Sequence, residues 1–173
     1  DLHSFPTRRS SDLQLADLVL PDILVLGKAL TGGYIGHAAT VANCKVYEGF
    51  YDDNFTHALM HGPTFMGNAL ACSVTLKSIK LFEIQDYMSK IHRIEKITRR
   101  EMNGFSDPRV KEVRIMGACV CIEVYDSDTI KGYQQFAYEH GVFSRPFLNY
   151  MYAMVPYVIK EKELVRVLST MKE

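Results

Sequence analysis

The stretch PDILVLGKALTGGYIGHAAT, Pro21–Thr40, is the key to interpreting the rest of the chain. Residues 23–26 (ILVL) form a short, uniformly apolar run, which is typical of a strand buried on both faces. Lys28 stands two residues after this run, and residues 31–33 (TGG) are a turn-forming cluster. A second apolar run, residues 38–41, follows the turn. The stretch therefore predicts two strands, with a lysine just after the C-terminal end of the first.

Lys28 is the candidate for chemistry in this stretch. Moving an ammonium group from water to a buried site favours the neutral amine, which is the nucleophile that Schiff-base formation needs. The alternative is a lysine whose side chain reaches along the surface to solvent. A Walker phosphate loop fits poorly, because Gly27-Lys28-Ala29 lacks the Ser or Thr that follows the lysine in that motif. The residues alone thus indicate a reactive amine, but they do not identify the molecule with which it reacts.

Length and composition limit the class of protein. The chain has 173 residues, enough for one domain or two small ones, and 47% of them are apolar. Its 20 basic and 20 acidic residues balance, which argues against a general attraction to nucleic acid or anionic membranes. No apolar run approaches the roughly 18 residues expected of a membrane-spanning helix. We therefore expect a cytoplasmic protein with neither nucleic acid nor a membrane as partner.

The four cysteines, Cys44, Cys72, Cys119 and Cys121, include no CxxC pair. We interpret them as small, buried apolar residues in a reducing compartment rather than as a disulfide or a metal site. Cys119 and Cys121 are expected on the same face of one strand, because strand side chains alternate.

A second motif, HGPTFMGNALAC at residues 61–72, accompanies GKALTGGY at residues 27–34. Together the two motifs resemble the class III (fold type I) pyridoxal-phosphate aminotransferases, and the resemblance covers about residues 14–173. It implies that pyridoxal 5'-phosphate is the cofactor and that Lys28 is the cofactor lysine. It also implies a homodimer with a shared active site.

The same resemblance implies cofactor contacts at Gly62, Pro63 and Thr64, with Thr64 reaching the cofactor phosphate of the neighbouring subunit. Gly62 is implied as a substrate contact as well. From the residues alone, Thr64 is predicted to be the N-cap of a long helix that begins near Phe65. A helix N-terminus suits a phosphate, and a plain capping threonine is the alternative.

The later part of the chain predicts alternating helices and strands. A short helix is predicted at residues 45–51, and the long helical period runs to residue 97 with a break near Gln85-Asp86. The basic residues between 90 and 100 are interpreted as a solvated helix face, because no aromatic residues are interleaved. Further predicted elements are strands at 110–115, 118–124, 142–147 and 151–159, and helices at 130–140 and 161–172.

Three details accompany these elements. Ser127 or Asp128 is expected to cap the helix over 130–140, and Gly141 to end it. Pro156 suggests that the strand over 151–159 lies at a sheet edge or carries a bulge. The break around Asn103-Gly104 is interpreted as a domain boundary.

Arg145 lies in an aromatic stretch, FSRPFLNYMYAMVPY, and Pro146 is expected to hold it extended. Its planar guanidinium suits a carboxylate. Cation–π packing or a structural salt bridge is the alternative. The family resemblance implies that Arg145 receives the substrate carboxylate, with Phe147 lining the same pocket.

The fold that we expect is α/β. Residues 14–105 would be the C-terminal part of a large cofactor-binding domain, residues 106–173 a small α+β domain, and residues 1–13 a non-native leader. Family members are much longer than this chain. The resemblance implies that the remainder, upstream of Lys28, holds the ring-stacking aromatic, a Gly-Ser phosphate loop and the aspartate of the ring nitrogen. We therefore expect the C-terminal portion of an enzyme, inactive by itself.

Within the family, the resemblance is greatest to the members of biotin biosynthesis. It implies transfer of an amino group from S-adenosylmethionine to 8-amino-7-oxononanoate. The alternatives are another class III enzyme that uses an omega-amino acid or lysine as donor, and a fragment with only a binding or structural role.

Overall fold

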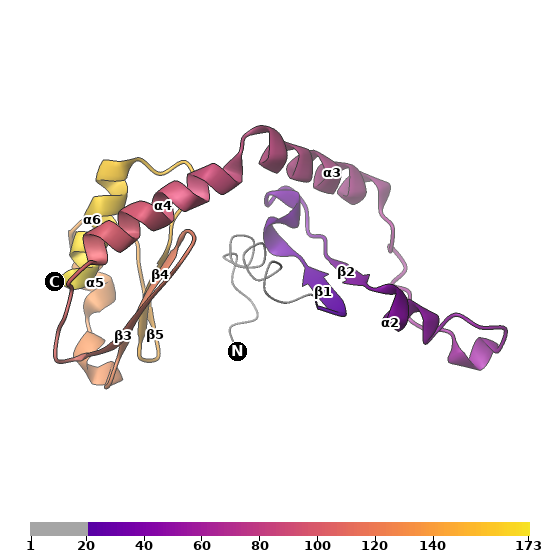
Figure 1. The fold of residues 1–173 in the computed structure, drawn as a ribbon, viewed down its shortest axis with the longest axis horizontal. Helices are drawn as coiled ribbons and strands as arrows, with labels where there is room; N and C mark the ends of the chain where they lie inside the picture. The colour runs from indigo at the N-terminus through magenta and orange to yellow at the C-terminus, as the bar shows by residue number, and fades with distance from the viewer. Residues whose placement is uncertain (1–20) are drawn as a thin grey trace. The chain divides into compact units, whose positions relative to one another are not determined.

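The computed structural model describes residues 21–173, so the predicted leader at residues 1–13 lies outside the described residues. The chain divides into two compact units, Asp1–Asp86 and Tyr87–Glu173 (Figure 1). The predicted boundary between residues 105 and 106 concerns the large and small domains of a longer enzyme, and it stays a prediction.

The first unit contains a two-stranded ribbon. Strands β1 (Ile23–Leu26) and β2 (Ala39–Ala42) pair antiparallel, so both predicted strands are confirmed. A 3-10 helix, Lys28–Thr31, stands at the exit of β1. The remaining elements of this unit are α2 (Cys44–Glu48), a 3-10 helix (Phe55–His57) and α3 (Ala69–Ile84).

The prediction that β1 is buried on both faces is wrong for this chain. Ile23 and Val25 are 52% and 57% exposed, whereas Leu24 and Leu26 are half-buried. Among the described residues only β2 pairs with β1, and no layer covers the face that carries Ile23 and Val25. An apolar run shows that a face is suited to burial, but it does not show which part of the chain or which partner buries it.

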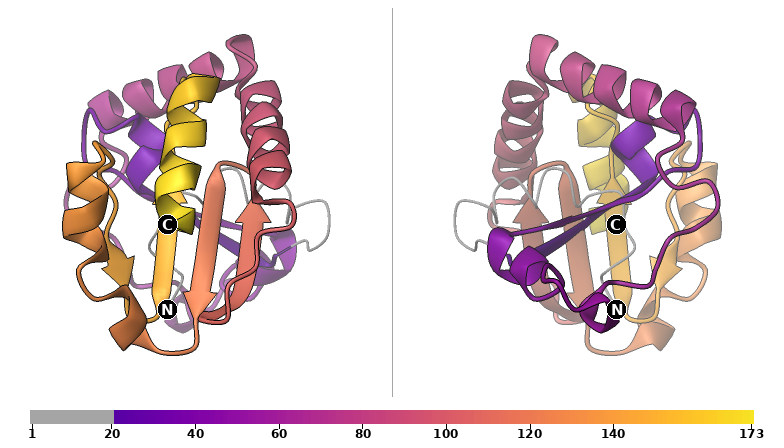
Figure 2. Two further views of the ribbon diagram at one scale, coloured as in Figure 1. Left: turned by 90° about the vertical axis from the view of Figure 1, so that its left-hand side faces the viewer. Right: turned by 90° about the vertical axis from the view of Figure 1, so that its right-hand side faces the viewer.

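The second unit is built on a four-stranded antiparallel sheet with the order β3-β4-β6-β5. Its strands are β3 (Val110–Met116), β4 (Cys119–Val124), β5 (Pro146–Phe147) and β6 (Tyr150–Met154). Its helices are α4 (Tyr87–Met102), a 3-10 helix (Ser127–Ile130), α5 (Tyr133–Glu139) and α6 (Glu161–Lys172). Helix α6 crosses one face of the sheet (Figure 2).

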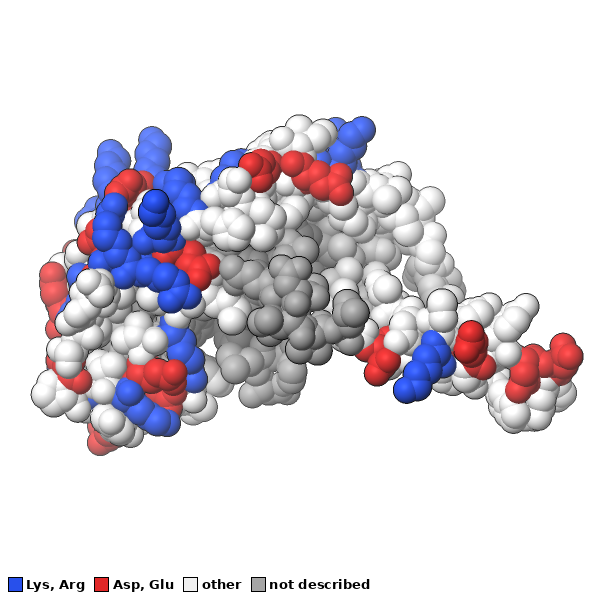
Figure 3. All heavy atoms as spheres, in the orientation of Figure 1, with Lys and Arg blue, Asp and Glu red and all other residues white. Residues whose placement is uncertain are grey.

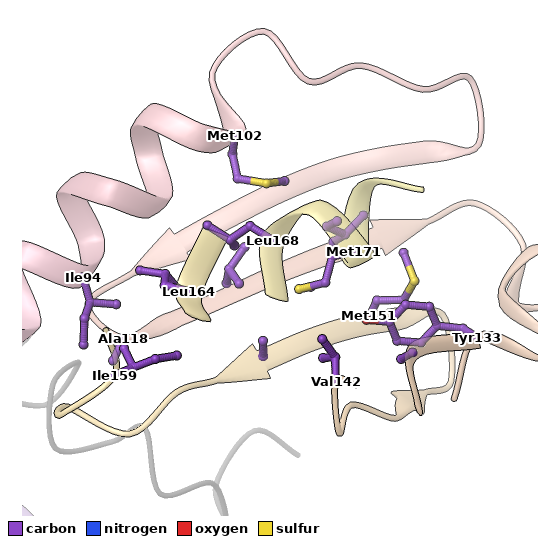
Figure 4. Close-up of a cluster of buried hydrophobic side chains, with 14 of the residues drawn as sticks. Ile94, Met102, Ala118, Tyr133, Val142, Met151, Ile159, Leu164, Leu168 and Met171 are labelled. Atoms are coloured by element: carbon purple, nitrogen blue, oxygen red, sulfur yellow. The ribbon is translucent and has the colours of Figure 1, made fainter. Parts of the chain in front are cut away.

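The core of the second unit lies between this sheet face and the helices (Figure 4). Leu164 and Leu168 of α6 are almost fully buried, as their helical spacing predicts, and so is Ile94 of α4. From the sheet, Val120 and Ile122 of β4 enter the core. The intervening residues of β4 point to the other face, so the period-two pattern over 118–124 is confirmed.

Two predicted strands are shorter in the structure. Of residues 142–147 only Pro146 and Phe147 are in a strand, and the last strand ends at Met154. The inference from Pro156 is therefore wrong: β6 lies inside the sheet, between β4 and β5, and Pro156 follows the end of the strand. Because β6 ends first, the missing N–H of the proline costs no ladder hydrogen bond.

The predicted helix over 130–140 is two elements. Gly132 has a φ of +86°, which an α-helix does not allow, so a 3-10 helix ends at Ile130 and α5 begins at Tyr133. The cap is Asp126, whose side chain accepts from the Asp128 N–H, and not Ser127 or Asp128. Gly141, with a φ of +70°, follows the end of α5 as predicted.

The break between α3 and α4 and the solvated basic face of α4 are confirmed. Helix α3 ends at Ile84 and α4 begins at Tyr87, and between them Asp86 has a φ of +46°. On α4, Arg99 pairs with Glu95 at 2.6 Å and Arg100 with Glu161 at 2.7 Å. Figure 3 shows acidic side chains among the Lys and Arg side chains over α4 and α6.

The cysteines are only in part as predicted. Cys44 is exposed, contrary to the prediction, because it opens the short and uncovered helix α2. Cys72, Cys119 and Cys121 are half-buried, and the last two lie on the same face of β4. Across residues 21–173, no helix combines the length and the apolar character that a bilayer span requires.

Candidate functional site

Lys28 is presented by a tight turn at the end of β1. It is the first residue of the 3-10 helix Lys28–Thr31, and its φ of +49° places it in the left-handed region. A side chain in that region costs roughly 1–2 kcal/mol, so the surrounding structure must impose it. Its ammonium is exposed, and no described residue forms a hydrogen bond or an ion pair with it. Of the two readings of the sequence, the structure therefore agrees with the lysine that reaches solvent and not with the buried amine, and the Lys28 nitrogen is accessible to a ligand.

The turn that carries Lys28 is fixed from within. Thr31 is fully buried, and its hydroxyl donates to the Ile35 carbonyl at 2.5 Å. Leu30 is also buried, and its N–H donates to the Gly27 carbonyl at 3.0 Å. Gly32, with a φ of +63°, closes the turn as only glycine does without strain. The TGG sequence therefore supplies both the buried anchor and the left-handed cap.

Thr64 does not cap a helix. Helix α3 begins at Ala69, and its N-cap is Asn68, whose side chain accepts from the Ala71 N–H at 3.0 Å. Gly67 has a φ of +73°, which prevents the helix from continuing back to Thr64. Thr64 instead lies in a turn closed by the Met66 N–H and the Pro63 carbonyl at 2.9 Å.

The turn at residues 62–64 is open to solvent. Gly62, Pro63 and Thr64 are exposed, and no described residue forms a hydrogen bond with the Thr64 hydroxyl. The phosphate contact implied for Thr64 would thus come from a hydroxyl in a loop and not from a helix N-terminus. The roles of these three residues stay predictions.

Arg145 and Phe147 lie together on one side of an extended segment. Phe143, Arg145 and Phe147 are exposed, and they alternate with the buried Val142 and Ser144. Among the described residues, none forms a hydrogen bond, an ion pair or a cation–π contact with the Arg145 guanidinium. Neither structural alternative, salt bridge or cation–π packing, is therefore formed within residues 21–173. The role of both residues in substrate binding stays a prediction.

The cysteines of β4 do not offer a competing nucleophile. Burial, together with the neighbouring Cys121 thiol, raises the pKa of Cys119 to about 11. Burial also raises the pKa of Cys121, although a hydrogen bond with Arg114 acts in the opposite direction. Both thiols are therefore neutral near pH 7, and a thiol is a far weaker nucleophile than a thiolate.

Sequence reasoning missed the residues that fix the Arg145 segment. Ser144, Glu123 and Asn149 make the contacts, and all three come from the second unit. One signal was available: Glu123 is a lone carboxylate in the apolar run 118–124. Nothing in the pattern, however, links that strand with the turn that holds Asn149.

Comparison with known proteins places the chain in a family. The profile of the family described as Aminotransferase class-III matches residues 14–173. Adenosylmethionine-8-amino-7-oxononanoate aminotransferase from Saccharomyces cerevisiae is 39% identical over 159 aligned positions, and the match covers 86% of this chain and 33% of the yeast protein. The enzyme of that name from Corynebacterium glutamicum is 36% identical and is matched over 36% of its length.

Solved structures agree with the sequence comparisons. The crystal structure of adenosylmethionine-8-amino-7-oxononanoate aminotransferase from Methanocaldococcus jannaschii DSM 2661 superposes with a TM-score of 0.77 at 31% identity, covering 94% of this chain and 40% of that one. An engineered omega transaminase superposes with a TM-score of 0.79 at 25% identity, covering 91% and 38%. The chain thus spans about a third of the length of the curated relatives that it matches. By its sequence and its fold, it belongs to the class III aminotransferases.

Proposed function

We propose that this chain is the lysine-bearing part of an enzyme that transfers an amino group from S-adenosylmethionine to 8-amino-7-oxononanoate, giving 7,8-diaminononanoate in biotin biosynthesis. The observation that carries the proposal is Lys28, an unpaired amine on a strained turn, in a chain that matches the family over residues 14–173. The names of the relatives from yeast and Corynebacterium glutamicum supply the two substrates.

The residues of the first unit fit pyridoxal phosphate, the cofactor of class III aminotransferases. An aldehyde condenses with an accessible primary amine, and the Lys28 side chain is exposed and unpaired among the described residues. A phosphate needs hydrogen-bond donors, and the Thr64 hydroxyl is exposed and available. When bound, the cofactor supplies an electron sink for the negative charge that develops on the substrate carbon.

In the proposed reaction, Lys28 has two tasks. Its Nζ would hold the cofactor. When it is not engaged in holding the cofactor, the same Nζ would accept a proton from the amine-bearing carbon of the donor as a general base, and it would return that proton as a general acid. Arg145 binds the carboxylate of the acceptor with its guanidinium fork, and Phe147 lines the chain of the acceptor.

Reductive labelling tests the assignment of Lys28. Borohydride treatment of the cofactor-loaded, full-length protein encoded by the reading frame that contains residues 14–173 should fix the pyridoxyl group on Lys28 as a stable amine. Peptide mass spectrometry locates the label, and a Lys45→Ala variant, which removes another exposed lysine of the first unit, should label normally. A label on any other lysine would contradict the assignment.

We also propose that the enzyme is a homodimer of the cytoplasm whose active site is shared between subunits. Residues 51–70 support this proposal, because every one of them is exposed in the chain. Phe55, Met60 and Phe65 are 82%, 89% and 83% exposed, and large apolar side chains gathered in one segment form a surface suited to burial by a second subunit.

Hybrid dimers test the shared site. If Thr64 acts across the interface, a dimer of one Lys28→Ala and one Thr64→Ala subunit has one site with both residues intact. Statistical exchange makes half of the dimers hybrids, so about a quarter of the sites should regain full activity. The measurement is activity after subunit exchange at limiting cofactor, with the two unmixed variants as controls. If subunit exchange is proven and the mixture is no more active than the Thr64→Ala protein that it contains, Thr64 acts in the active site of its own subunit.

Another class III reaction, with an omega-amino acid or lysine as donor, is the alternative that the omega transaminase structures support. Measuring turnover of the full-length protein with each amino donor in turn distinguishes this alternative from the proposed reaction. Turnover with lysine or an omega-amino acid and none with S-adenosylmethionine would favour the alternative.

A further inference from the structure

We infer that Glu123 and Asn149 are positioning residues for Arg145: they hold the β5–β6 hairpin on which the substrate-binding side chain is presented. The inference rests on the proposed function, because it takes Arg145 as the residue that binds the acceptor carboxylate. It adds two residues that do not themselves contact substrate.

The β5–β6 hairpin has few stabilising interactions of its own. β5 has only two residues, lies at the edge of the sheet, and pairs with β6 through Pro146 opposite Met151 and Phe147 opposite Tyr150. Leu148, in the connecting turn, has a φ of +52°, which is costly for a residue with a branched side chain. A two-residue edge strand with a strained turn does not hold a neighbouring arginine without additional contacts.

Asn149 supplies such contacts from the turn to β4. Its side-chain amide donates to the Val124 carbonyl at 3.2 Å and to Glu123 Oε1 at 3.5 Å. Its own carbonyl accepts from the Val124 N–H at 2.9 Å. The turn is thus tied at three points to a central strand of the sheet.

Glu123 is held in turn by two cations. Its side chain is only 6% exposed, and it is the one buried carboxylate among residues 21–173. Lys111 Nζ donates to Oε1 at 2.6 Å, and Arg114 Nη2 lies 3.0 Å from Oε2. The hydrogen bond from Lys111 holds the pKa of Glu123 below its usual value, so the carboxylate is charged near pH 7.

Arg114 extends the network to the hairpin itself. Its guanidinium lies 5.5 Å from the centre of the Tyr150 ring, and Tyr150 is the strand partner of Phe147. On the other flank of Arg145, the buried Ser144 hydroxyl donates to the Tyr152 carbonyl at 3.2 Å. The backbone on both sides of Arg145 is therefore anchored, while its guanidinium is left unpaired, which is the arrangement that pre-organises a binding side chain.

The test compares Asn149→Ala with Asn103→Ala, the same change in the turn after α4, in the full-length protein. A second pair, Glu123→Gln and Glu112→Gln, compares the buried carboxylate with its cross-strand neighbour on β3, whose side chain is 53% exposed and lies 3.4 Å from Arg114. Each protein is assayed with 8-amino-7-oxononanoate and with its methyl ester, which lacks the charge that Arg145 would bind. The donor half-reaction is followed separately by the absorbance of the cofactor.

Loss of the hydrogen bond to the Val124 carbonyl and of the longer one to the Glu123 carboxylate should raise the KM for the acid about fivefold in Asn149→Ala. The KM for the ester and the donor half-reaction should stay within about twofold, since a general loss of structure would affect all three alike. The amides of Phe147 and Tyr150 should exchange hydrogen faster. In an Arg145→Ala background, Asn149→Ala should add nothing.

Equal losses with acid and ester, or an unchanged KM for the acid, would overturn the positioning role. If Arg145→Ala itself leaves the preference for acid over ester intact, the proposed function of Arg145 fails, and the positioning role fails with it. If Arg145→Ala abolishes the preference but Asn149→Ala does not reduce it, only the positioning role is wrong.

Discussion

Replacing Lys28 by alanine should lower the turnover of the full-length enzyme by a factor of about 1,000 or more. General acid–base catalysis alone contributes about 10²–10⁴ to a rate, and Lys28→Ala also removes the covalent anchor of the cofactor. The measurement is a single-turnover half-reaction with S-adenosylmethionine at saturating cofactor. Lys45→Ala, at another exposed lysine of the first unit, should retain normal turnover.

A second measurement separates chemistry from folding at this site. Lys28 has a φ of +49°, and alanine tolerates the left-handed region no better than lysine does, whereas glycine does so without strain. The free energy of unfolding of Lys28→Gly should therefore equal that of the parent or exceed it by up to about 1 kcal/mol. The variant should nevertheless be as inactive as Lys28→Ala. Retained turnover in the glycine variant would remove Lys28 from the chemistry, whatever its effect on stability.

Structural features that depend on the hydrophobic period within a single helix or strand were predictable from the sequence. Leu164 and Leu168 recur at helical spacing, and α6 runs over Glu161–Lys172, which is the predicted range. The alternation of Val120 and Ile122 likewise gave the buried face of β4. In each case the hydrophobic period is set by the geometry of the element itself.

Backbone conformation at single glycines was not predictable. Thr64 and Asn68 are both good caps, and only the left-handed Gly67 between them decides that α3 starts at the second. Gly132 in the same way divides the predicted helix over 130–140. Glycine adopts helical and left-handed conformations about equally well, so its place in a pattern does not reveal which one it takes.

The candidate site was predicted as a set of residues and not as an arrangement. The motifs gave Lys28, Thr64 and Arg145, and the structure shows the first two exposed in one unit and the third in the other. The ion pairs of Glu123 join residues 12 and 9 positions apart, and its contact with Asn149 spans 26 positions. Contacts of that range depend on strand register, which a local pattern does not contain.

Replacing Arg145 by lysine or alanine should selectively remove recognition of the acceptor carboxylate. A charge pair that is closed off from water loses about 2–5 kcal/mol when one partner is truncated, so kcat/KM for 8-amino-7-oxononanoate should fall by a factor of about 30 or more in Arg145→Ala. Arg145→Lys keeps the charge but loses the bidentate fork, and we expect an intermediate loss. The donor half-reaction should be unchanged, because in the proposed reaction the donor reacts before the acceptor binds.

The methyl ester of the acceptor makes this prediction specific to the carboxylate. The parent enzyme should prefer the acid to the ester by about the factor that Arg145→Ala loses, and in Arg145→Ala the preference should vanish. Arg100→Ala is the matched control, because Arg100 is exposed on α4 and pairs with Glu101 and Glu161 at the protein surface. If Arg145→Ala still prefers the acid, another cation binds the carboxylate, and the exposed, unpaired guanidinium of Arg145 must have a different partner.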